Sequence, residues 1–343
     1  MLKTEDFTYH LPCGLIAQEP LPQRDHSRLL FLHRRTGKVE HHHFYDLPTL
    51  LGPGDFLVLN DTRVLPARLF GHKEGKTGRV EILLLRPCGE NRWEIICSPG
   101  KRARPGDRLI FGDGRLKGEI LQILDSGNRI VSFRTTGSEL YPLLDELGEV
   151  PLPPYIKKEL GDGERYQTVY SRERGSAAAP TAGLHFTPSI FEKLRKGGLE
   201  WAFLTLHIGL GTFRPVKTRF VADHHMHSEH YAISATVAKK INEAKKAGRR
   251  IIAVGTTCCR VLEAQADEKG FLREGRGETN IFIYPGYQFK AIDGLLTNFH
   301  LPRSTLLMLT CALAGRENVL EAYHEAVQLK YRFYSFGDCM LII

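Results

Sequence analysis

Residues 176–187 read Ser176-Ala-Ala-Ala-Pro-Thr-Ala-Gly-Leu-His-Phe-Thr187, a run with almost no side-chain bulk. Such a run can neither fill a core nor stay exposed through charge, so we expect its backbone to pack close to another group. Thr187 and Pro188 predict a helix that starts here, with the threonine as N-cap, and continues to about Arg195. A small-residue loop before a helix offers free backbone N–H groups to a polar or anionic ligand. The alternative is an ordinary tight turn in front of a helix.

The chain has 343 residues, enough for two domains of ordinary size. Hydrophobic residues make up 42% and charged residues 25%, which argues against an intrinsically disordered protein. The formal charge of +8 favours a polyanionic partner such as nucleic acid. Seven scattered cysteines and an N-terminus without an apolar signal sequence indicate a cytoplasmic protein with reduced thiols. The longest apolar run, 306–314, is too short to cross a bilayer, so we expect no membrane partner.

The first 136 residues are rich in strand-like segments. The histidines at 41–43 lie beside strand-like residues, which indicates a partly exposed strand edge rather than a metal site. Strand-like runs then recur at 79–86, 92–97, 108–111, 115–124 and 129–134, and 65–70 could supply a sixth. This spacing is typical of a small antiparallel barrel or sandwich. We therefore predict an inserted β-barrel domain at 67–136.

After a proline-rich joint at 150–155, helix-like and strand-like segments alternate. Helices are predicted at 188–196, 234–246, 258–267, 304–314 and 319–329, and strands at 200–206, 251–254 and 281–284. This alternation predicts an α/β domain with a mixed sheet covered by helices. Residues 1–66 and 137–343 would form it together.

Two motifs resemble nucleotide-binding loops and fail on inspection. Gly71-His-Lys-Glu-Gly-Lys-Thr77 has three residues between its glycines where a P-loop has four, and it lies between strands. Gly209-Leu-Gly211 lacks the third glycine of a dinucleotide fingerprint, because Arg214-Pro215 stands in its place.

Two glycine-containing loops nevertheless follow predicted strands, at His207-Ile-Gly-Leu-Gly-Thr-Phe213 and at Gly255-Thr-Thr257. Open α/β sheets bind ligands at the carboxyl ends of their strands. The free amides and hydroxyls of the second loop could hold a carboxylate or ribose hydroxyls. A plain strand-to-helix turn is the alternative for each loop.

The densest cluster of titratable groups is Asp223-His-His-Met-His-Ser-Glu229. In an extended chain His225, His227 and Glu229 would share one face. Two imidazoles and a carboxylate could bind zinc or iron, or they could relay protons near neutral pH. A solvated strand rich in histidine is the third reading.

Three further segments are candidates for binding. Asn298 and His300 precede a helix capped by Ser304, which suggests the wall of a pocket. The segment 331–338 interleaves aromatic residues with charged ones and could stack on a base or stabilise a cation, or it could be a buried C-terminal strand. The basic run 101–108 could follow a phosphate backbone, or it could be a solvated hairpin tip.

Long motifs run from one end of the chain to the other. They include Arg24-Asp-His-Ser-Arg-Leu-Leu30, Asn60-Asp-Thr-Arg-Val-Leu-Pro-Ala-Arg68, Arg165-Tyr-Gln-Thr-Val-Tyr170, Ala179-Pro-Thr-Ala-Gly-Leu-His-Phe186, Leu206-His-Ile-Gly-Leu-Gly-Thr-Phe213, Thr297-Asn-Phe-His-Leu-Pro302 and Ser335-Phe-Gly-Asp338. With these motifs the chain resembles the S-adenosylmethionine:tRNA ribosyltransferase-isomerase family of queuosine biosynthesis. It departs from the family at Glu278, where a tryptophan is expected, and at Cys258-Cys259 after the two threonines.

The resemblance implies a β-barrel inserted into an α/β domain. It also implies that the ribosyl part of S-adenosylmethionine is transferred and isomerised onto 7-aminomethyl-7-deazaguanine at the wobble position of tRNA. The products would be epoxyqueuosine in tRNA, adenine and methionine. S-adenosylmethionine would be a consumed co-substrate, with no other cofactor and no metal. We expect this co-substrate and tRNA as partners, and a monomeric protein in the cytoplasm.

This chemistry needs proton transfer, because the sulfonium acidifies the adjacent 5′-carbon and adenine must leave with acid or hydrogen-bond help. The predicted catalytic residues are His185, His207, His225, His227, Glu229 and Asp338. The two carboxylates among them would orient an imidazole or balance the charge of the sulfonium. The predicted substrate-binding residues are Thr181, Gly183, Gly209, Gly211, Thr212, Gly255, Thr256, Thr257, Arg260, Asn298 and His300. Among them, Arg260 would clamp a carboxylate of the substrate. The predicted tRNA-binding residues are Arg24, Arg28, Arg63, Lys101, Arg102 and Arg104.

Two other function classes compete with this one. A metal-dependent hydrolase could be built on His225, His227 and Glu229. A non-catalytic RNA-binding protein is the other, but binding a nucleic-acid backbone needs only Lys and Arg, so the crowded titratable loops argue against it.

Overall fold

The computed structural model describes residues 1–135, 137–209 and 216–343. These residues form two compact units. The first comprises Met1–Thr62, Pro154–Glu173 and Ala179–Ile343, and the second comprises Arg63–Pro153 and Arg174–Ala178. Each unit is described by itself.

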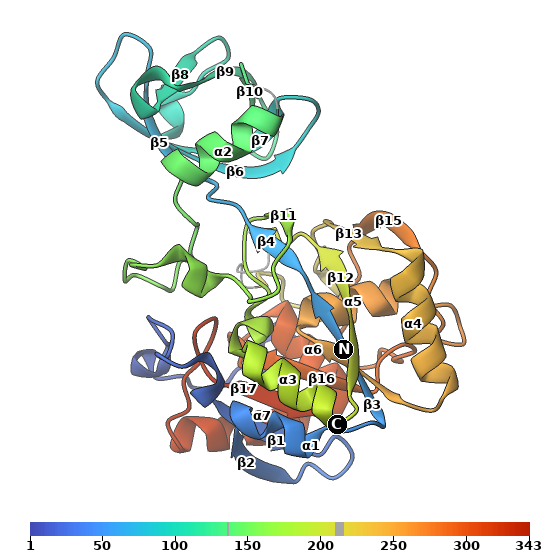
Figure 1. Ribbon diagram of the computed structural model, residues 1–343. Helices are drawn as coiled ribbons and strands as arrows, with labels where there is room; N and C mark the ends of the chain where they lie inside the picture. The colour runs from blue at the N-terminus through green and yellow to red at the C-terminus, as the bar shows by residue number, and fades with distance from the viewer. Residues whose placement is uncertain (136, 210–215) are drawn as a thin grey trace. The chain divides into compact units, whose positions relative to one another are not determined.

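The first unit contains a nine-stranded mixed sheet (Figure 1). In spatial order its strands are β15 (Gly275–Thr279), β13 (Glu229–Ile233), β12 (Glu200–Leu206), β3 (Asp55–Asn60), β14 (Arg250–Val254), β16 (Gly294–Asn298), β17 (Cys339–Ile342), β1 (Arg28–Leu32) and β2 (Val39–His43). The four strands β12, β3, β14 and β16 run parallel to their neighbours within this set. The other neighbouring pairs are antiparallel, except that β1 runs parallel to β17. The predicted α/β class with a mixed sheet is confirmed.

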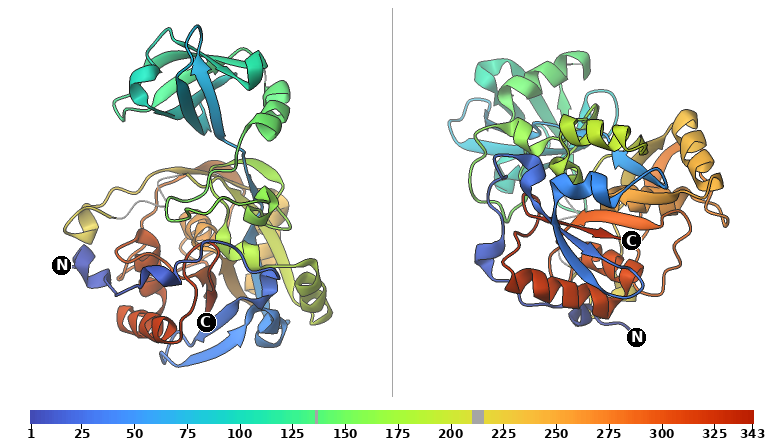
Figure 2. Two further views of the ribbon diagram at one scale, coloured as in Figure 1. Left: turned by 90° about the vertical axis from the view of Figure 1, so that its left-hand side faces the viewer. Right: turned by 60° about the horizontal axis from the view of Figure 1, so that its bottom comes forward.

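Helices cover this sheet. They are α1 (Leu47–Leu50), α3 (Pro188–Lys196), α4 (Ala235–Lys246), α5 (Thr256–Gln265), α6 (Thr305–Ala314) and α7 (Arg316–Gln328). Strands β3 and β16 are buried along their whole length, which requires cover on both faces. On one face, α1 and α3 share a hydrophobic cluster with side chains of β3 and β14. The C-terminal helices α6 and α7 lie side by side (Figure 2).

The local sequence explains why α3 starts where it does. Thr187 Oγ1 accepts a hydrogen bond from Ile190 N at 3.3 Å, and Pro188 occupies the first helical position. The helix ends at Lys196, just before Gly197. The predicted helix at 188–196 is therefore confirmed, together with its cap.

One predicted strand is wrong. Residues 281–284 were expected to form a strand because they are apolar, but they adopt no strand conformation. The strand is instead β15, of sequence Gly-Arg-Gly-Glu-Thr, which pairs antiparallel with β13 at the end of the sheet. An edge strand is held by its backbone ladder, so it shows little hydrophobic pattern. At the opposite edge β2 is half-buried, which confirms the strand-edge interpretation of the histidines at 41–43.

The second unit contains a closed barrel of six antiparallel strands (Figure 1). The strands are β5 (Arg68–Lys73), β6 (Arg79–Pro87), β7 (Arg92–Ser98), β8 (Arg108–Phe111), β9 (Leu116–Ile123) and β10 (Arg129–Phe133). The helix α2 (Gly137–Leu147) inserts Leu140 and Leu144 into the barrel core. Five of these strands lie where the sequence predicts strands, and β5 begins and ends three residues later than the predicted strand at 65–70. Two short strands, β4 (Thr62–Val64) and β11 (Glu173–Ser176), form a separate two-stranded sheet.

Within the described part of the chain, every helix is too short or too polar to span a membrane.

Candidate functional site

The carboxyl ends of four strands meet at one edge of the large sheet. Since β12, β3, β14 and β16 are parallel, the residues that follow them lie along the same edge. Asn60 ends β3 and its Nδ2 donates to Leu206 O at the end of β12, at 3.0 Å. The Gly255 loop follows β14, and Asn298 ends β16. Segments that are distant in sequence are thereby brought together.

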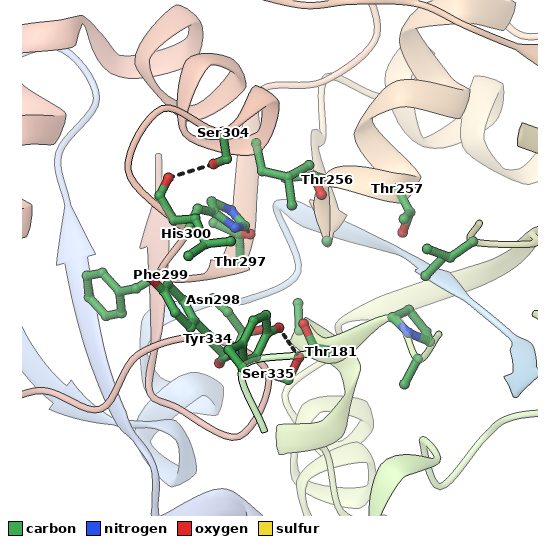
Figure 3. Close-up of a pocket in the computed structure, with 18 residues that line it drawn as sticks. Thr181, Thr256, Thr257, Thr297, Asn298, Phe299, His300, Ser304, Tyr334 and Ser335 are labelled. Carbon is green, nitrogen blue, oxygen red and sulfur yellow. Dashed lines mark hydrogen bonds between the residues drawn. The ribbon is translucent and has the colours of Figure 1, made fainter. Parts of the chain in front are cut away.

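A pocket opens at this edge (Figure 3). It contains about 680 Å³ of empty space, including the part open to solvent. Small-molecule sites are roughly 300–1,000 Å³. The predicted substrate-binding residues that line it are Thr181, Gly255, Thr256, Thr257, Asn298 and His300. None of the described residues that line it is an Asp, Glu, Lys or Arg.

The start of α5 forms one wall of the pocket. Gly255 has φ of 89°, a conformation that favours glycine, and it turns the chain from β14 into the helix. The helix begins at Thr256, two residues earlier than expected, so both threonines lie in its first turn. The first N–H groups of a helix have no partner within the helix and carry partial positive charge. This wall therefore suits a carboxylate or another anionic group.

The small-residue run packs closely, as expected. It forms the short 3-10 helix η8 (Thr181–His185). A Cβ on Gly183 would lie 2.0 Å from the Tyr170 hydroxyl, so only glycine lets the backbone approach this ring. Thr181 on the same short helix lines the pocket.

His185 is buried and neutral. Its Nδ1 lies 2.7 Å from Ser27 Oγ, and its Nε2 lies 3.1 Å from Asn298 Nδ2. Burial, with a further contribution from the charges of Arg24 and Arg332, lowers its pKa to about 3. It lines a neighbouring pocket rather than the large one, and Ser335 lines both. With both ring nitrogens engaged, His185 holds Asn298 in place in this structure.

His300 is the second buried imidazole. Its Nε2 lies 2.9 Å from Thr297 Oγ1, and its backbone N–H donates to the Tyr323 hydroxyl at 3.0 Å. Burial lowers its pKa to about 3, so the ring is neutral near pH 7. A neutral ring can shape the pocket and accept or donate one hydrogen bond.

Because His185 and His300 are buried and neutral, we expect the stability of the folded protein to fall at acidic pH. The unfolded chain binds a proton at each histidine below about pH 6.5, whereas the folded protein binds it only near pH 3. Stability should therefore fall as the pH drops below 6.5, by about 1.4 kcal/mol per pH unit for each histidine. Urea unfolding at pH 7, 6 and 5 should show a shallower loss in a His300→Gln variant than in the wild type.

The matched control for this experiment is His324→Gln, because His324 is exposed. Its stability should change with pH as in the wild type. If the wild type and His300→Gln lose stability in parallel, His300 is not held neutral by burial and the assignment is wrong.

The third histidine of this edge, His207, follows β12. Its Nδ1 lies 2.8 Å from Thr62 Oγ1. Burial and the charge of His230 lower its pKa, while Glu173 acts in the opposite direction. The next residue, Ile208, lines the large pocket. His207 is therefore a neutral imidazole near pH 7, one residue before a residue that lines the pocket.

The predicted cluster His225, His227 and Glu229 is only partly assembled. His227 Nε2 lies 3.4 Å from Glu229 Oε1, whereas His225 is exposed. Glu229 is buried, pairs with Arg260 and accepts a hydrogen bond from Gly209 N at 3.1 Å. Burial alone would raise the pKa of Glu229, but the His227 hydrogen bond and the Arg260 charge outweigh it and lower the pKa.

Arg260 is committed to protein acceptors. Besides Glu229 it donates to the carbonyl oxygens of Ile281 at 3.2 Å and Thr279 at 3.3 Å. The carboxylate that it contacts is thus the protein's own, and its predicted role as a clamp on substrate stays a prediction. Among the described residues, no three His, Cys, Asp or Glu side chains are arranged to hold a metal ion.

Asp338 anchors the C-terminal segment. Its carboxylate accepts hydrogen bonds from Arg28 N and Arg332 N, each at 2.8 Å, and from Arg28 Nε at 3.2 Å. Arg28 also stacks over the Tyr331 ring, with its guanidinium carbon 4.0 Å from the ring centre. Arg24 donates to the carbonyl oxygens of Gln167 at 2.9 Å and Leu184 at 3.2 Å. These predicted catalytic and tRNA-binding groups therefore make structural contacts within the first unit.

The other predicted tRNA-binding residues belong to the second unit. Lys101, Arg102 and Arg104 lie in and after the short helix η5 (Gly100–Arg102), and all three are exposed. Arg102 also donates to Arg79 O at 2.8 Å. Arg63 is half-buried. Of the predicted substrate-binding residues, Gly211 and Thr212 lie outside the described part of the chain.

Some lining residues were missed. They are Tyr155, Thr297, Tyr334 and Ser335, which line the pocket, and Ser27, which contacts His185. Ser27, Thr297 and Ser335 lie in the long motifs, Tyr155 ends the proline-rich joint, and Tyr334 belongs to the candidate segment 331–338. The Tyr155 hydroxyl lies 2.7 Å from Ser335 Oγ. A single sequence gives no signal that these distant segments meet.

Comparison with known proteins adds independent information. The family model described as "Queuosine biosynthesis protein" matches residues 4–342. An S-adenosylmethionine:tRNA ribosyltransferase-isomerase from Acetivibrio thermocellus is 57% identical over 99% of this chain and 100% of its own length. A protein of the same name from Thermoanaerobacter sp. is 54% identical over the full length of both chains. The crystal structure of an S-adenosylmethionine tRNA ribosyltransferase from Thermotoga maritima is 39% identical, with a TM-score of 0.56 over 98% of this chain and 100% of that chain.

Proposed function

The chain belongs to the tRNA ribosyltransferase-isomerase family of queuosine biosynthesis, and from this membership we propose the following reaction for it. The ribosyl moiety of S-adenosylmethionine is transferred and isomerised onto 7-aminomethyl-7-deazaguanine at the wobble position of tRNA. Epoxyqueuosine in tRNA is formed, and adenine and methionine leave. S-adenosylmethionine is consumed as a co-substrate, and the reaction uses no metal.

The observation that carries this proposal is the pocket at the carboxyl edge of the sheet. It gathers six predicted binding residues from three separate segments of the chain. S-adenosylmethionine would place its carboxylate at the first turn of α5, beside Thr256 and Thr257. The aromatic side chains of Tyr155, Phe299 and Tyr334 line the same pocket and can stabilise a sulfonium cation.

His207 is the histidine best suited to remove the proton from the 5′-carbon. It is neutral near pH 7, it adjoins the pocket through Ile208, and its Nδ1 is oriented by Thr62. The other predicted histidines are less suitable: His185 has both nitrogens engaged, and His227 contacts Glu229. The proton would move from the 5′-carbon to the imidazole of His207.

A turnover assay tests the proposal. The protein is incubated with S-adenosylmethionine, tRNA carrying the aminomethyl base and a chelator, and the digested RNA is analysed by mass spectrometry. We expect the epoxy-cyclopentane nucleoside in equimolar amount with free adenine and methionine. Absence of product with chelator, and its appearance on addition of a metal, would contradict the metal-free reaction. Absence of product under both conditions would contradict the proposed substrate.

A further inference from the structure

Asn298 combines a place in the pocket wall with an unusual buried atom. The residue is only 3% exposed and lines the pocket, yet its Oδ1 has no hydrogen-bond partner among the described residues. Buried polar atoms nearly always have a partner, so a buried acceptor without one, on a residue that lines a pocket, calls for an explanation.

The orientation of this amide is determined by its other end. Asn298 Nδ2 lies 3.2 Å from Tyr334 O, 3.4 Å from Asp338 O and 3.1 Å from His185 Nε2. If the amide were turned over, its oxygen would face two carbonyl oxygens and lose these hydrogen bonds. The nitrogen therefore stays on this side, and Oδ1 is a fixed acceptor.

His185 supports the same orientation. Its Nε2 faces an N–H donor and must accept, so the proton of the neutral ring resides on Nδ1, next to Ser27 Oγ. The ring also stacks on Phe44, with centres 5.2 Å apart. Its position and tautomer keep the Asn298 amide from rotating, which makes His185 a positioning residue.

The charge of the pocket indicates which kind of ligand group would donate a hydrogen bond to Asn298 Oδ1. A carboxylate beside an amine stabilises its ammonium form, whereas an uncharged, dehydrated pocket favours the neutral amine. The described lining residues include no Asp, Glu, Lys or Arg, and His300 is neutral there. An amide oxygen can bind an amine N–H without holding the extra proton. The nucleophile of the proposed reaction is an amine that must be neutral to attack.

We propose that Asn298 Oδ1 accepts a hydrogen bond from the aminomethyl group of the tRNA base, and that His185 fixes Asn298 for this contact. The assignment rests on the proposed function. It places the amine at Asn298, at the end of β16, and the carboxylate of S-adenosylmethionine beside Thr256, at the start of α5; Figure 3 shows these two residues of the pocket. The two reactants would then contact different walls of the pocket.

Equilibrium binding tests this without turnover. The dissociation constants of two tRNAs are compared, one with the 7-aminomethyl base and one with unmodified guanine at that position. The wild type should prefer the first tRNA, and Asn298→Ala should lose about 10- to 100-fold of this preference, as expected for one hydrogen bond in a buried site. The dissociation constant for S-adenosylmethionine should remain within about twofold of the wild type, a range smaller than the loss of one hydrogen bond.

A second variant, Asn298→Asp, tests the same contact if Asn298→Ala does not fold. Asn298→Asp places a carboxylate beside the amine, so turnover at pH 7 should fall and should recover as the pH is raised and the ammonium loses its proton. Asn318→Asp is the matched control, because Asn318 Nδ2 likewise donates to a backbone carbonyl, Ala314 O at 2.9 Å, but lies outside this pocket. It should show no such recovery with pH.

The outcomes separate the two hypotheses. A retained preference for the aminomethyl base with weakened S-adenosylmethionine binding would assign Asn298 Oδ1 to the co-substrate and overturn the inference. Unchanged values for both ligands would show that Oδ1 contacts neither. A wild type that binds the aminomethyl tRNA preferentially but forms no product would contradict the proposed function while leaving the inference standing.

Discussion

Replacing His207 by glutamine is expected to lower turnover about 100- to 10,000-fold, the usual contribution of a positioned general base. The proposed reaction needs a neutral group to take a proton from the 5′-carbon. His207 is held neutral by burial and oriented through its 2.8 Å contact with Thr62 Oγ1. Glutamine can keep a hydrogen bond to Thr62 but cannot take up a proton at neutral pH. Single-turnover kinetics with saturating substrates measure the effect.

The pH dependence and two controls make this result interpretable. Because the folded-state pKa of His207 is lowered, the base is free at pH 7, and wild-type turnover should fall only as the pH drops through that lowered value. His33→Gln, on the exposed end of the sheet, should turn over at the wild-type rate. Affinity for S-adenosylmethionine should be unchanged in His207→Gln. A glutamine variant that turns over normally would remove His207 from the reaction and leave it a structural contact of Thr62.

Replacing Glu229 by glutamine should lower the free energy of unfolding by about 3–5 kcal/mol, the usual cost of leaving a buried charge unpaired. Arg260 and Glu229 form a buried pair, with side chains 4% and 1% exposed. The variant keeps the shape of the side chain but leaves the guanidinium without its counter-charge. It also weakens the contact that holds Gly209 N. Urea unfolding at pH 7 measures the loss.

Glu192→Gln is the matched control for this variant. Glu192 also pairs with a cation, Lys196, at 2.7 Å, but both side chains are more than half exposed. Such a pair contributes about 0–1 kcal/mol. The Glu229 contribution should be complete above pH 4.5, the ordinary value for glutamate, and should be lost as the pH falls through the lowered folded-state pKa. Equal losses in the two variants would show that the buried pair contributes no more than an exposed one.

The strongest predictions from sequence concern elements with local signals. The N-cap Thr187 with Pro188, and the barrel strands between turns, depend on residues close together in the chain, so their patterns are visible without the fold. The prediction fails at β15, whose sequence Gly-Arg-Gly-Glu-Thr is held by pairing with β13. The helix α2 was not predicted, because its Leu140 and Leu144 find their partners only in the barrel. Tertiary contacts decide both.

In the candidate site, too, some features are visible in the sequence and others depend on tertiary contacts. The residue types at Thr181, Gly255 and Asn298 mark them as candidates, because glycine loops and polar groups at strand ends are typical of ligand sites. The roles of the titratable residues are not visible in this way. His185 and Asp338 are titratable in sequence, but in the structure one is neutral and buried and the other accepts hydrogen bonds from Arg28 and Arg332.

The α/β class and the inserted barrel could be predicted from the sequence, because periodicity, turn residues and motifs are local or linear properties. Which of the candidate segments meet depends on tertiary contacts. The parallel order of β12, β3, β14 and β16 brings four strand ends to one edge. Burial makes His185 and His300 neutral, pairs Glu229 with Arg260 and leaves Asn298 Oδ1 without a hydrogen-bond partner among the described residues. These properties depend on desolvation and on distances between residues far apart in the chain, which no single stretch of sequence contains.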